Sequence, residues 1–166
     1  MRASALSARK KEKKNSFFLR SAGIWVIVAV ILLDQLTKAL ISRYIPLDQS
    51  ITLITHVFSL TLVHNSGAAF GILKNQTILF IIISLIALPS IFFGFKADPA
   101  RRRSVLTQMA LFLVVAGAIG NLIDRIAWGY VIDFLDFHVW PVFNVADSAI
   151  SIGAILLGYS LLKTKI

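Results

Sequence analysis

The sequence predicts an all-α membrane protein with four transmembrane helices, a small extracytoplasmic β-sheet and a re-entrant or interfacial segment. Hydrophobic residues make up 57% of the 166 amino acids, and the mean hydropathy is +0.81. The apolar residues are gathered in four long runs, and basic residues flank these runs instead of forming one patch. Such a composition suits one compact domain that is embedded in lipid.

The four apolar runs cover residues 22–41, 77–95, 105–126 and 146–162. A helix rises about 1.5 Å per residue, so roughly 20 residues cross the hydrocarbon core. The first three runs are long enough, whereas the fourth is apolar only over residues 148–162 and needs Ala146 and Asp147 as its first turn to reach across. The first run follows basic residues, as in a signal peptide, but no small-residue cleavage site comes after it. We therefore expect an uncleaved helix.

The distribution of positive charge predicts the orientation of the helices. Basic residues lie in the first 20 residues, between the second and third runs, and at the end of the chain, whereas residues 127–146 contain no lysine or arginine. By the positive-inside rule, both termini are cytoplasmic. Residues 1–20 form a basic cytoplasmic tail, which we expect to be largely disordered and attracted to anionic headgroups. Residues 21–166 form a single domain. The net charge of +9 is thus explained by a membrane and not by nucleic acid.

The first outer segment, residues 42–76, is more than a simple loop. It contains β-branched, alternating stretches at residues 51–55 and 59–63, which predict two short strands. A turn of small residues follows at 65–69. We expect a small sheet on the outer membrane face that ends in a re-entrant turn.

The sequence has few of the residues that bind cofactors. It has no cysteine, and its histidines, His56, His64 and His138, occur singly rather than at metal-ligand spacing. No phosphate-binding loop or dinucleotide motif is present. Ser66 lies near His64, but no nucleophile elbow surrounds it. We therefore expect neither a metal ion nor another cofactor.

Asp34 and Lys38 lie four residues apart near the outer end of the first span, so they share one face of the helix. They could form part of a polar wall around a site. Alternatively, they could neutralise each other and extend to the interface, because both positions lie too close to the helix end for deep burial. The sequence leaves both interpretations open.

A polar stripe follows the third span at three- and four-residue spacing, and it consists of Gly117, Gly120, Asn121, Asp124 and Arg125. Glycines in a membrane helix allow the close approach of a neighbouring helix. Asn121 points an amide toward the same interior. For Asp124 and Arg125, the sequence favours a structural ion pair that borders a site over direct catalysis by Asp124.

Asp133 and Asp147 lie where apolar helices should meet the outer surface of the membrane. A carboxylate at such a boundary costs free energy unless it has a partner or a function. Taken singly, Asp133 could be a solvated loop residue and Asp147 a helix N-cap. However, they lie on the same side, an aromatic-rich link joins them, and Asn144 adds an amide one turn before Asp147. The sequence therefore predicts a catalytic pair.

Two carboxylates about 3 Å apart share one proton, because both cannot be ionised comfortably. The ionised carboxylate can take a proton from water while the protonated one donates to a carbonyl oxygen. This chemistry hydrolyses a peptide bond without a metal, a cysteine or a covalent intermediate. The predicted activity of the pair is therefore that of a peptidase.

Five ordered motifs in this chain resemble those of the prolipoprotein signal peptidases, or type II signal peptidases, of bacterial membranes. They are Asp34-Gln-Leu-Thr-Lys38, Asn65-Ser-Gly-Ala-Ala-Phe-Gly71, Gly117-Ala-Ile-Gly-Asn-Leu-Ile-Asp-Arg125, Val131-Ile-Asp-Phe134 and Phe143-Asn-Val-Ala-Asp-Ser148. The four-helix layout also agrees, and the resemblance covers residues 24–162. Ala116, Trp140 and the basic tail depart from the usual pattern of that family.

The resemblance implies an aspartic endopeptidase of the bacterial cytoplasmic membrane. Its substrates would be lipid-modified precursor lipoproteins, cleaved just before the cysteine that carries the diacylglyceryl group, and the cyclic peptide globomycin would inhibit it. The catalytic aspartates of the family correspond to Asp133 and Asp147, toward the extracytoplasmic face. The substrate-binding or site-supporting residues correspond to Asp34, Lys38, Asn65, Gly67, Asn121, Asp124, Arg125 and Asn144.

Two other classes of function remain as alternatives. Carboxylates in membranes often mark ion paths, so a small transporter or proton-conducting subunit is the stronger alternative. Such proteins usually show repeats and place charge near the midplane, whereas here repeats are absent and the charges gather toward the outer ends. The other alternative is a membrane scaffold with polar contacts between its helices, which has little need of Asp133.

Overall fold

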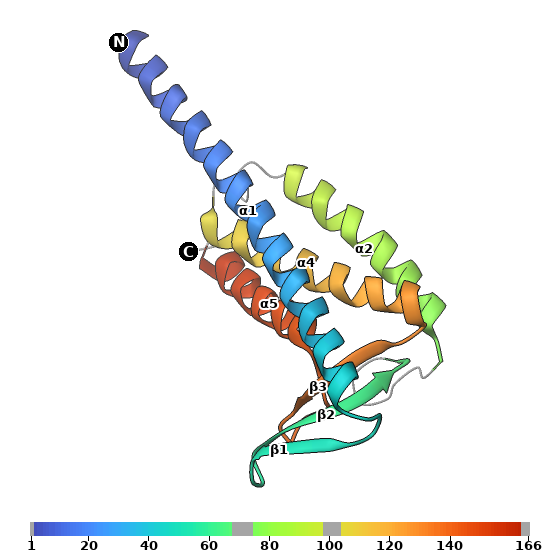
Figure 1. Cartoon of the computed structure of the whole chain (residues 1–166). Helices are drawn as coiled ribbons and strands as arrows, with labels where there is room; N and C mark the ends of the chain where they lie inside the picture. Colours follow the sequence, from blue (N-terminus) through green and yellow to red (C-terminus); the bar gives the residue numbers. More distant parts are fainter. Residues whose placement is uncertain (1, 68–74, 98–103, 164–166) are drawn as a thin grey trace.

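The computed structural model describes residues 2–67, 75–97 and 104–163, apart from the side chains of residues 2–21, 92 and 95–97. Its elements follow in the order α1 (Arg2–Tyr44), β1 (Ser50–Ile54), β2 (Phe58–Asn65), α2 (Thr77–Ala97), α4 (Val105–Trp128), β3 (Val131–Asp136) and α5 (Val145–Lys163). The helices pack into one bundle, and the sheet lies at the end of the bundle that is distant from the N-terminus (Figure 1).

Among the described residues, three helical stretches are long and apolar enough to cross a membrane: Ala22–Tyr44, Val105–Trp128 and Val145–Lys163. They confirm three of the predicted spans, with bounds that differ by at most three residues. The helix α2 is apolar over the shorter stretch Thr77–Ile91 and contains Pro89. Its assignment as a fourth span therefore stays a prediction.

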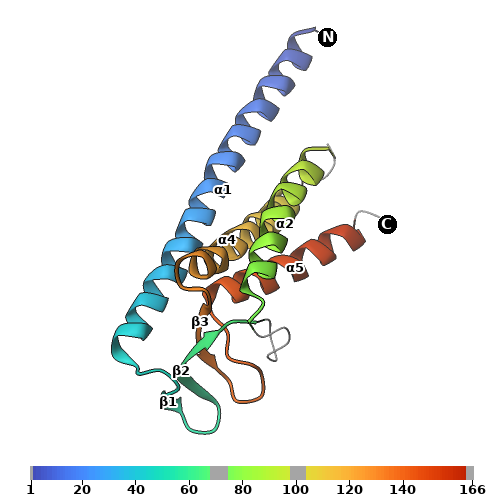
Figure 2. The same ribbon diagram turned by 90° about the vertical axis from the view of Figure 1, so that its right-hand side faces the viewer.

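The helix α1 begins at Arg2, well before the membrane span that it contains. The sequence predicts a largely disordered tail here, whereas the backbone is helical and extends beyond the other helices (Figure 2). This stretch contains neither proline nor glycine, and a helix that is already nucleated propagates easily through alanine, lysine and arginine. The division of the chain into a tail and one domain stays a prediction.

The helix α4 is central, because α1, α2 and α5 all pack against it. Its contact with α5 is the most extensive, and glycines on both helices bring the backbones close together. Gly117 lies against the backbone carbonyl of Ala146, and Gly153 lies against that of Ala110. Small residues are what allow such an approach in membrane helices, so this part of the predicted stripe has a packing function.

Replacing Gly117 with alanine is expected to lower the melting temperature in detergent, because the new methyl group would overlap the Ala146 carbonyl. Overpacking of this kind costs about 1–3 kcal/mol. The control Gly158→Ala, on α5, adds a methyl group where no atom lies within 4 Å. It should melt like the wild type. Equal melting of the two variants would contradict the importance of the close α4–α5 contact.

The sheet is antiparallel, with strand order β1-β2-β3. The strands β1 and β2 correspond to the two stretches that the sequence predicts as strands, with bounds shifted by one or two residues, and they pair as an antiparallel hairpin. The predicted re-entrant turn at 65–69 begins at the end of β2, but its residues 68 and 69 lie outside the described residues. Only the entry into that turn is therefore described.

The third strand is a feature that the sequence analysis does not predict. It comes from beyond α4 and pairs with β2, so that Val63 lies opposite Asp133. The helix α4 continues to Trp128, where Gly129 ends it in the left-handed conformation, with φ 82°. A residue without a Cβ adopts this conformation readily, and the chain turns back as a strand. Asp133 is thus held in a sheet rather than in a solvated loop.

A small apolar core joins the end of α1 to one face of the sheet. Its buried members and the residues packed around them are Ile45, Leu62 and Ile132, with Ile41, Leu60 and Tyr130. Successive side chains of a strand point to opposite faces. Because Ile132 faces this core, Asp133 points to the other face.

Candidate active site

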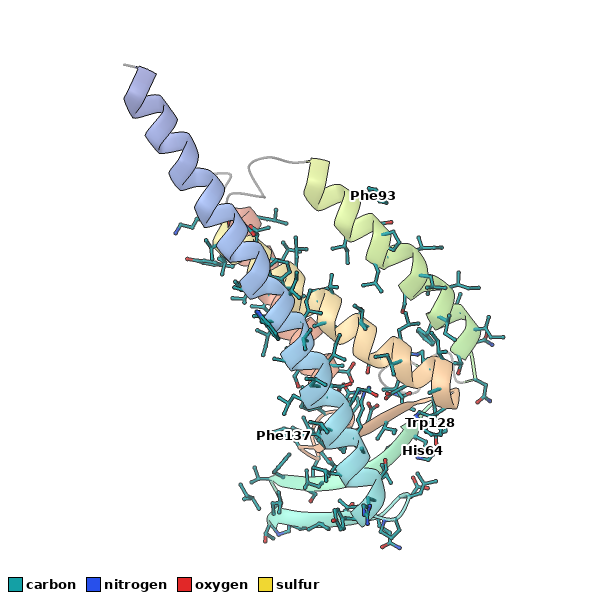
Figure 3. All side chains as sticks on the ribbon, turned by 45° about the horizontal axis from the view of Figure 1, so that its top comes forward. His64, Phe93, Trp128 and Phe137 are labelled. Atoms are coloured by element: carbon teal, nitrogen blue, oxygen red, sulfur yellow. The ribbon has the colours of Figure 1, made fainter. Side chains whose placement is uncertain are left out.

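A cluster of buried polar side chains lies where α1, α4 and the start of α5 meet β3. The region is at the sheet end of the bundle, where Trp128 and Phe137 are also found (Figure 3). The members that are less than 10% exposed are Asp34, Lys38, Asn121, Asp124, Asp133 and Asn144. Buried charges are costly unless they are paired and hydrogen-bonded. Among the described residues, every buried side-chain nitrogen and oxygen has a hydrogen-bond partner.

Lys38 is the hub of the charged part of this cluster. Its Nζ lies 2.8 Å from Asp34 Oδ2 and 2.8 Å from Asp124 Oδ2, and it donates to Asn121 Oδ1 at 3.2 Å. An ammonium group has three N–H donors, so all three are used inside the protein. The interpretation that Asp34 and Lys38 extend to the interface is therefore wrong. The side chains of Asp34 and Lys38 are only 0% and 2% exposed. Their burial is tolerated because Asp124, on another helix, supplies a second anion to Lys38.

Asp124 pairs with Lys38, so the predicted ion pair between Asp124 and Arg125 is wrong. Neighbouring residues of a helix point in different directions, with 3.6 residues per turn. Asp124 faces α1, and its Oδ2 also accepts a hydrogen bond from the backbone N–H of Ile132 at 3.1 Å. Asp124 therefore holds the residue immediately before Asp133.

Asp34 makes an equivalent contact at the other aspartate. Its Oδ1 accepts a hydrogen bond from the backbone N–H of Ala146 at 2.9 Å, and Ala146 is the residue immediately before Asp147. The two carboxylates that share Lys38 thus each hold the backbone beside one of the two predicted catalytic aspartates.

Gln35 belongs to this network, although the sequence analysis assigns it no function. Its Nε2 donates to Asp124 Oδ1 at 2.8 Å, and it lies 3.2 Å from Asp34 Oδ2 and 3.3 Å from the Gly120 carbonyl. The one available signal was its position inside the motif at 34–38. The helix spacing that pairs Asp34 with Lys38 does not select Gln35, because a residue next to Asp34 does not lie on the same face of the helix.

Asp133 is 1% exposed, and each of its carboxylate oxygens accepts a hydrogen bond from an amide. Asn65 Nδ2 donates to Oδ2 at 2.9 Å, and Asn144 Nδ2 donates to Oδ1 at 2.7 Å. Burial, and then the nearby charge of Asp147, raise the pKa of Asp133 to about 7, although the two amides and Lys38 favour the ionised form. Asp133 can therefore carry a proton near neutral pH.

Asp147 lies in the first turn of α5, as predicted, but it is not the N-cap. Asn144 has that function, because its Oδ1 accepts a hydrogen bond from the Asp147 backbone N–H at 2.8 Å. The Asp147 carboxylate is oriented by another amide, since Asn121 Nδ2 donates to its Oδ1 at 2.7 Å.

The side chain of Asn144 joins the two aspartates. Its Nδ2 donates to the Asp133 carboxylate, while its Oδ1 accepts from the Asp147 backbone. Nδ2 also lies 3.0 Å from Asn121 Oδ1 and 3.3 Å from the Ile132 carbonyl. A side-chain amide has two N–H donors, so both are used by this surrounding set of acceptors. A single buried amide thereby fixes the positions of Asp133 and the start of α5 relative to each other.

Arg125 connects this region to the end of β2. Its guanidinium donates to the Gly67 carbonyl at 3.4 Å and lies over the ring of Phe80, 5.0 Å from the ring centroid. The Gly67 N–H in turn donates to Asn65 Oδ1 at 3.0 Å. The amide of Asn65 is thus oriented by Gly67 on one side and donates to Asp133 on the other.

The structure therefore brings all ten predicted site residues into one connected network. Two carboxylates, the buried Asp133 and the half-buried Asp147, are held by asparagine side chains, and Asp133 can hold a proton at neutral pH. This arrangement can perform acid–base chemistry on a water molecule. Among the described residues, no group of three or more His, Cys, Asp or Glu side chains is placed to hold a metal ion.

Comparison with known proteins identifies the family. The sequence model of the Signal peptidase (SPase) II family, Peptidase_A8, matches residues 26–163. The lipoprotein signal peptidase of Halothermothrix orenii is 46% identical over 132 residues, which cover 80% of this chain and 89% of that protein. The lipoprotein signal peptidase of Pelotomaculum thermopropionicum is 45% identical over 142 residues, or 84% and 91% of the two chains. A solved bacterial membrane enzyme, 37% identical, superposes with a TM-score of 0.81 over 87% of this chain and 90% of its own. The chain therefore belongs to the signal peptidase II family of aspartic peptidases, and it is a multi-pass bacterial membrane enzyme.

Proposed function

We propose that the protein cleaves the signal peptide from diacylglyceryl-modified prolipoproteins, just before the lipidated cysteine, and that Asp133 and Asp147 form its catalytic dyad. The observation that carries this proposal is the contact of one buried side chain, Asn144, with both aspartates. A purely structural asparagine cap would need only the contact to the helix backbone. The second contact, to a carboxylate in a strand, is what a dyad of fixed geometry requires.

In the proposed mechanism, Asp133 is the general acid and Asp147 the general base. Asp133 holds the proton, because burial raises its pKa to about 7. Asp147 removes a proton from water, whose oxygen attacks the scissile carbonyl carbon, while Asp133 donates its proton to the carbonyl oxygen. Asp147 then passes the proton it gained to the departing amine, and Asp133 regains one from the intermediate. No covalent bond to the enzyme forms.

The other site residues divide into two groups by the use of their polar atoms. The first group supports the dyad, because its donors and acceptors are engaged within the protein: Asp34, Lys38, Asn121, Asp124 and Asn144. The second group borders the dyad on the side of β2 and comprises Asn65, Gly67 and Arg125. We assign contact with the substrate backbone to this second group.

The orientation in the bacterial cytoplasmic membrane follows from the positions of charge. The start of α1 and the end of α5 lie at the end of the bundle away from the sheet (Figure 1). Basic residues flank that end, so we propose four spans with cytoplasmic termini and a dyad near the extracytoplasmic surface. A lipid-anchored precursor could then reach the site laterally from the bilayer. The basic tail and the aromatic-rich link between Asp133 and Asp147 would contact membrane lipids.

A gel-shift assay on the purified enzyme tests the proposed function. The wild type should shorten a precursor lipoprotein that carries the diacylglyceryl group, and globomycin should block the reaction. The same precursor without the lipid is the matched control and should remain uncut. Absence of cleavage of the modified precursor in several lipid mixtures would contradict the proposal. Proton-flux measurements in vesicles would then test the transporter alternative.

The rate of cleavage is expected to fall as the pH rises above about 7. The reason is that Asp133 must be protonated to act as an acid, and a group with a raised pKa of about 7 loses its proton in that range. Each further pH unit should lower kcat/KM by about tenfold. Measurement of kcat/KM from pH 5 to 9 checks this prediction.

The variant Asn65→Leu gives an internal check on that profile. Asn65 donates to Asp133 and favours the ionised form, so its removal should raise the pKa of Asp133 further. The alkaline fall in rate should move to higher pH, even if the maximal rate is lower. A profile that is flat to pH 9 in the wild type would contradict the assignment of Asp133 as the acid.

A further inference from the structure

Among the residues that the structure describes, few contacts engage the guanidinium of Arg125, which lies near the dyad. It carries five N–H groups, and its contacts with described residues are the Gly67 carbonyl and the ring of Phe80. The carboxylates of Asp147, Asp133 and Asp124 all lie close enough to attract this cation. Within the described part of the chain, however, it forms no ion pair with either carboxylate. Most of its hydrogen-bonding capacity is therefore not used by these neighbours.

The docking of α2 on α4 places Phe80 over this guanidinium. Thr77, at the start of α2, donates through its hydroxyl to the carbonyl of Gly129, which caps α4. Phe80 follows Thr77 by about one turn, and Arg125 precedes Gly129 by about one turn. The two helices meet at these ends (Figure 1), so one contact surface contains both the Thr77–Gly129 bond and the Phe80–Arg125 stack.

An aromatic ring beside an arginine attracts the guanidinium and restrains the side chain. The ring attracts the cation through its quadrupole, and here the guanidinium carbon of Arg125 lies over the Phe80 ring, 5.0 Å from its centroid. An unrestrained arginine loses side-chain entropy when it is immobilised by a ligand. A ring that already restrains it removes part of that cost before the ligand arrives.

We infer that Phe80 is a positioning residue, which holds Arg125 so that its N–H edge meets backbone carbonyl oxygens of the precursor beside the scissile bond. This inference rests on the proposed function, because the ligand is the extended peptide of a lipid-modified precursor. Phe80 itself does not touch the reacting atoms. It acts through Arg125, and its removal should weaken binding of the precursor more than it slows the chemical step.

The test measures the Kd of the modified precursor by fluorescence in the Asp147→Asn background, where the dyad is disabled. Phe80→Leu keeps most of the volume and removes the ring, and it should raise the Kd by about three- to tenfold. Phe80→Tyr keeps the ring and should bind like the unchanged background. Phe93→Leu is the matched control, since Phe93 lies at the other end of α2 (Figure 3), and it should also leave the Kd unchanged.

A double variant separates positioning from general packing. In an Arg125→Lys background the planar group is absent, so Phe80→Leu should change the Kd by less than twofold. An unchanged Kd for Phe80→Leu alone, or an equal effect in both backgrounds, would overturn the inference. In the active enzyme, Phe80→Leu should raise KM with kcat within about twofold. Failure of the proposed function would show itself separately, as absence of cleavage by the wild type.

Discussion

Asparagine at position 133 or 147 is expected to lower the rate of prolipoprotein cleavage by roughly 10³-fold or more. Asparagine has nearly the shape of aspartate but neither removes a proton from water nor donates an acidic proton. In Asp147→Asn the proposed base is lost, and in Asp133→Asn the proposed acid is lost. Because both groups act in one step, the double variant should be little slower than either single variant. Gel-shift kinetics with the lipid-modified precursor measure all three rates.

The matched control for these variants is Asp136→Asn. Asp136 lies in the same strand as Asp133, but its carboxylate accepts from Thr61 and from the backbone of His138 rather than from the dyad asparagines. Its replacement should leave the rate within about threefold of the wild type. Melting curves of all variants establish that the inactive ones are folded. Cleavage at the full rate by Asp133→Asn or Asp147→Asn would falsify the dyad assignment.

Replacement of Lys38 with methionine is expected to destabilise the protein by about 3–5 kcal/mol. Methionine has a similar length, but it leaves Asp34 and Asp124 buried without their shared cation. Two anions then face each other in a setting that water does not reach, which costs far more than the loss of a surface pair. The melting temperature in detergent should fall steeply, and activity should fall with it.

Two further variants give this second prediction its controls. Lys163→Met changes the same residue type at an exposed position near the end of α5 and should melt like the wild type. Adding Asp124→Asn to Lys38→Met removes one of the two stranded anions, so it should restore part of the lost stability. A Lys38→Met protein that melts at the wild-type temperature would show that the buried cation does not stabilise the fold.

The sequence was sufficient to predict most features that depend on local pattern. Three spans could be placed within a few residues, because hydropathy over about 20 residues is a strong signal. The strands β1 and β2 could be predicted from alternation. Asp133 and Asp147 could be proposed as site residues because carboxylates are rare near apolar helices. The five ordered motifs then indicated the family.

The features that were missed all depend on contacts between distant parts of the chain. Helix spacing pairs Asp34 with Lys38, but the sequence around them does not show that Asp124 is the second carboxylate that pairs with Lys38. The strand β3 is short and carries two carboxylates, so its pairing with β2 is visible only in three dimensions. The cap at the start of α5 was assigned to Asp147 as an alternative, because the sequence does not reveal which of two polar residues a helix end uses.

The pairing of β2 with β3 determines how late in synthesis the site can assemble. The two strands are separated in the chain by the whole of α2 and α4, so the β1–β2 hairpin is synthesised long before its third strand. Until β3 has been synthesised after α4, one edge of β2 has no partner strand, and the Asn65 amide has no Asp133 carboxylate to which it can donate. Asn144 and Asp147 arrive later still, with the last helix. With the proposed dyad, catalytic competence is therefore expected only once the last helix has been inserted.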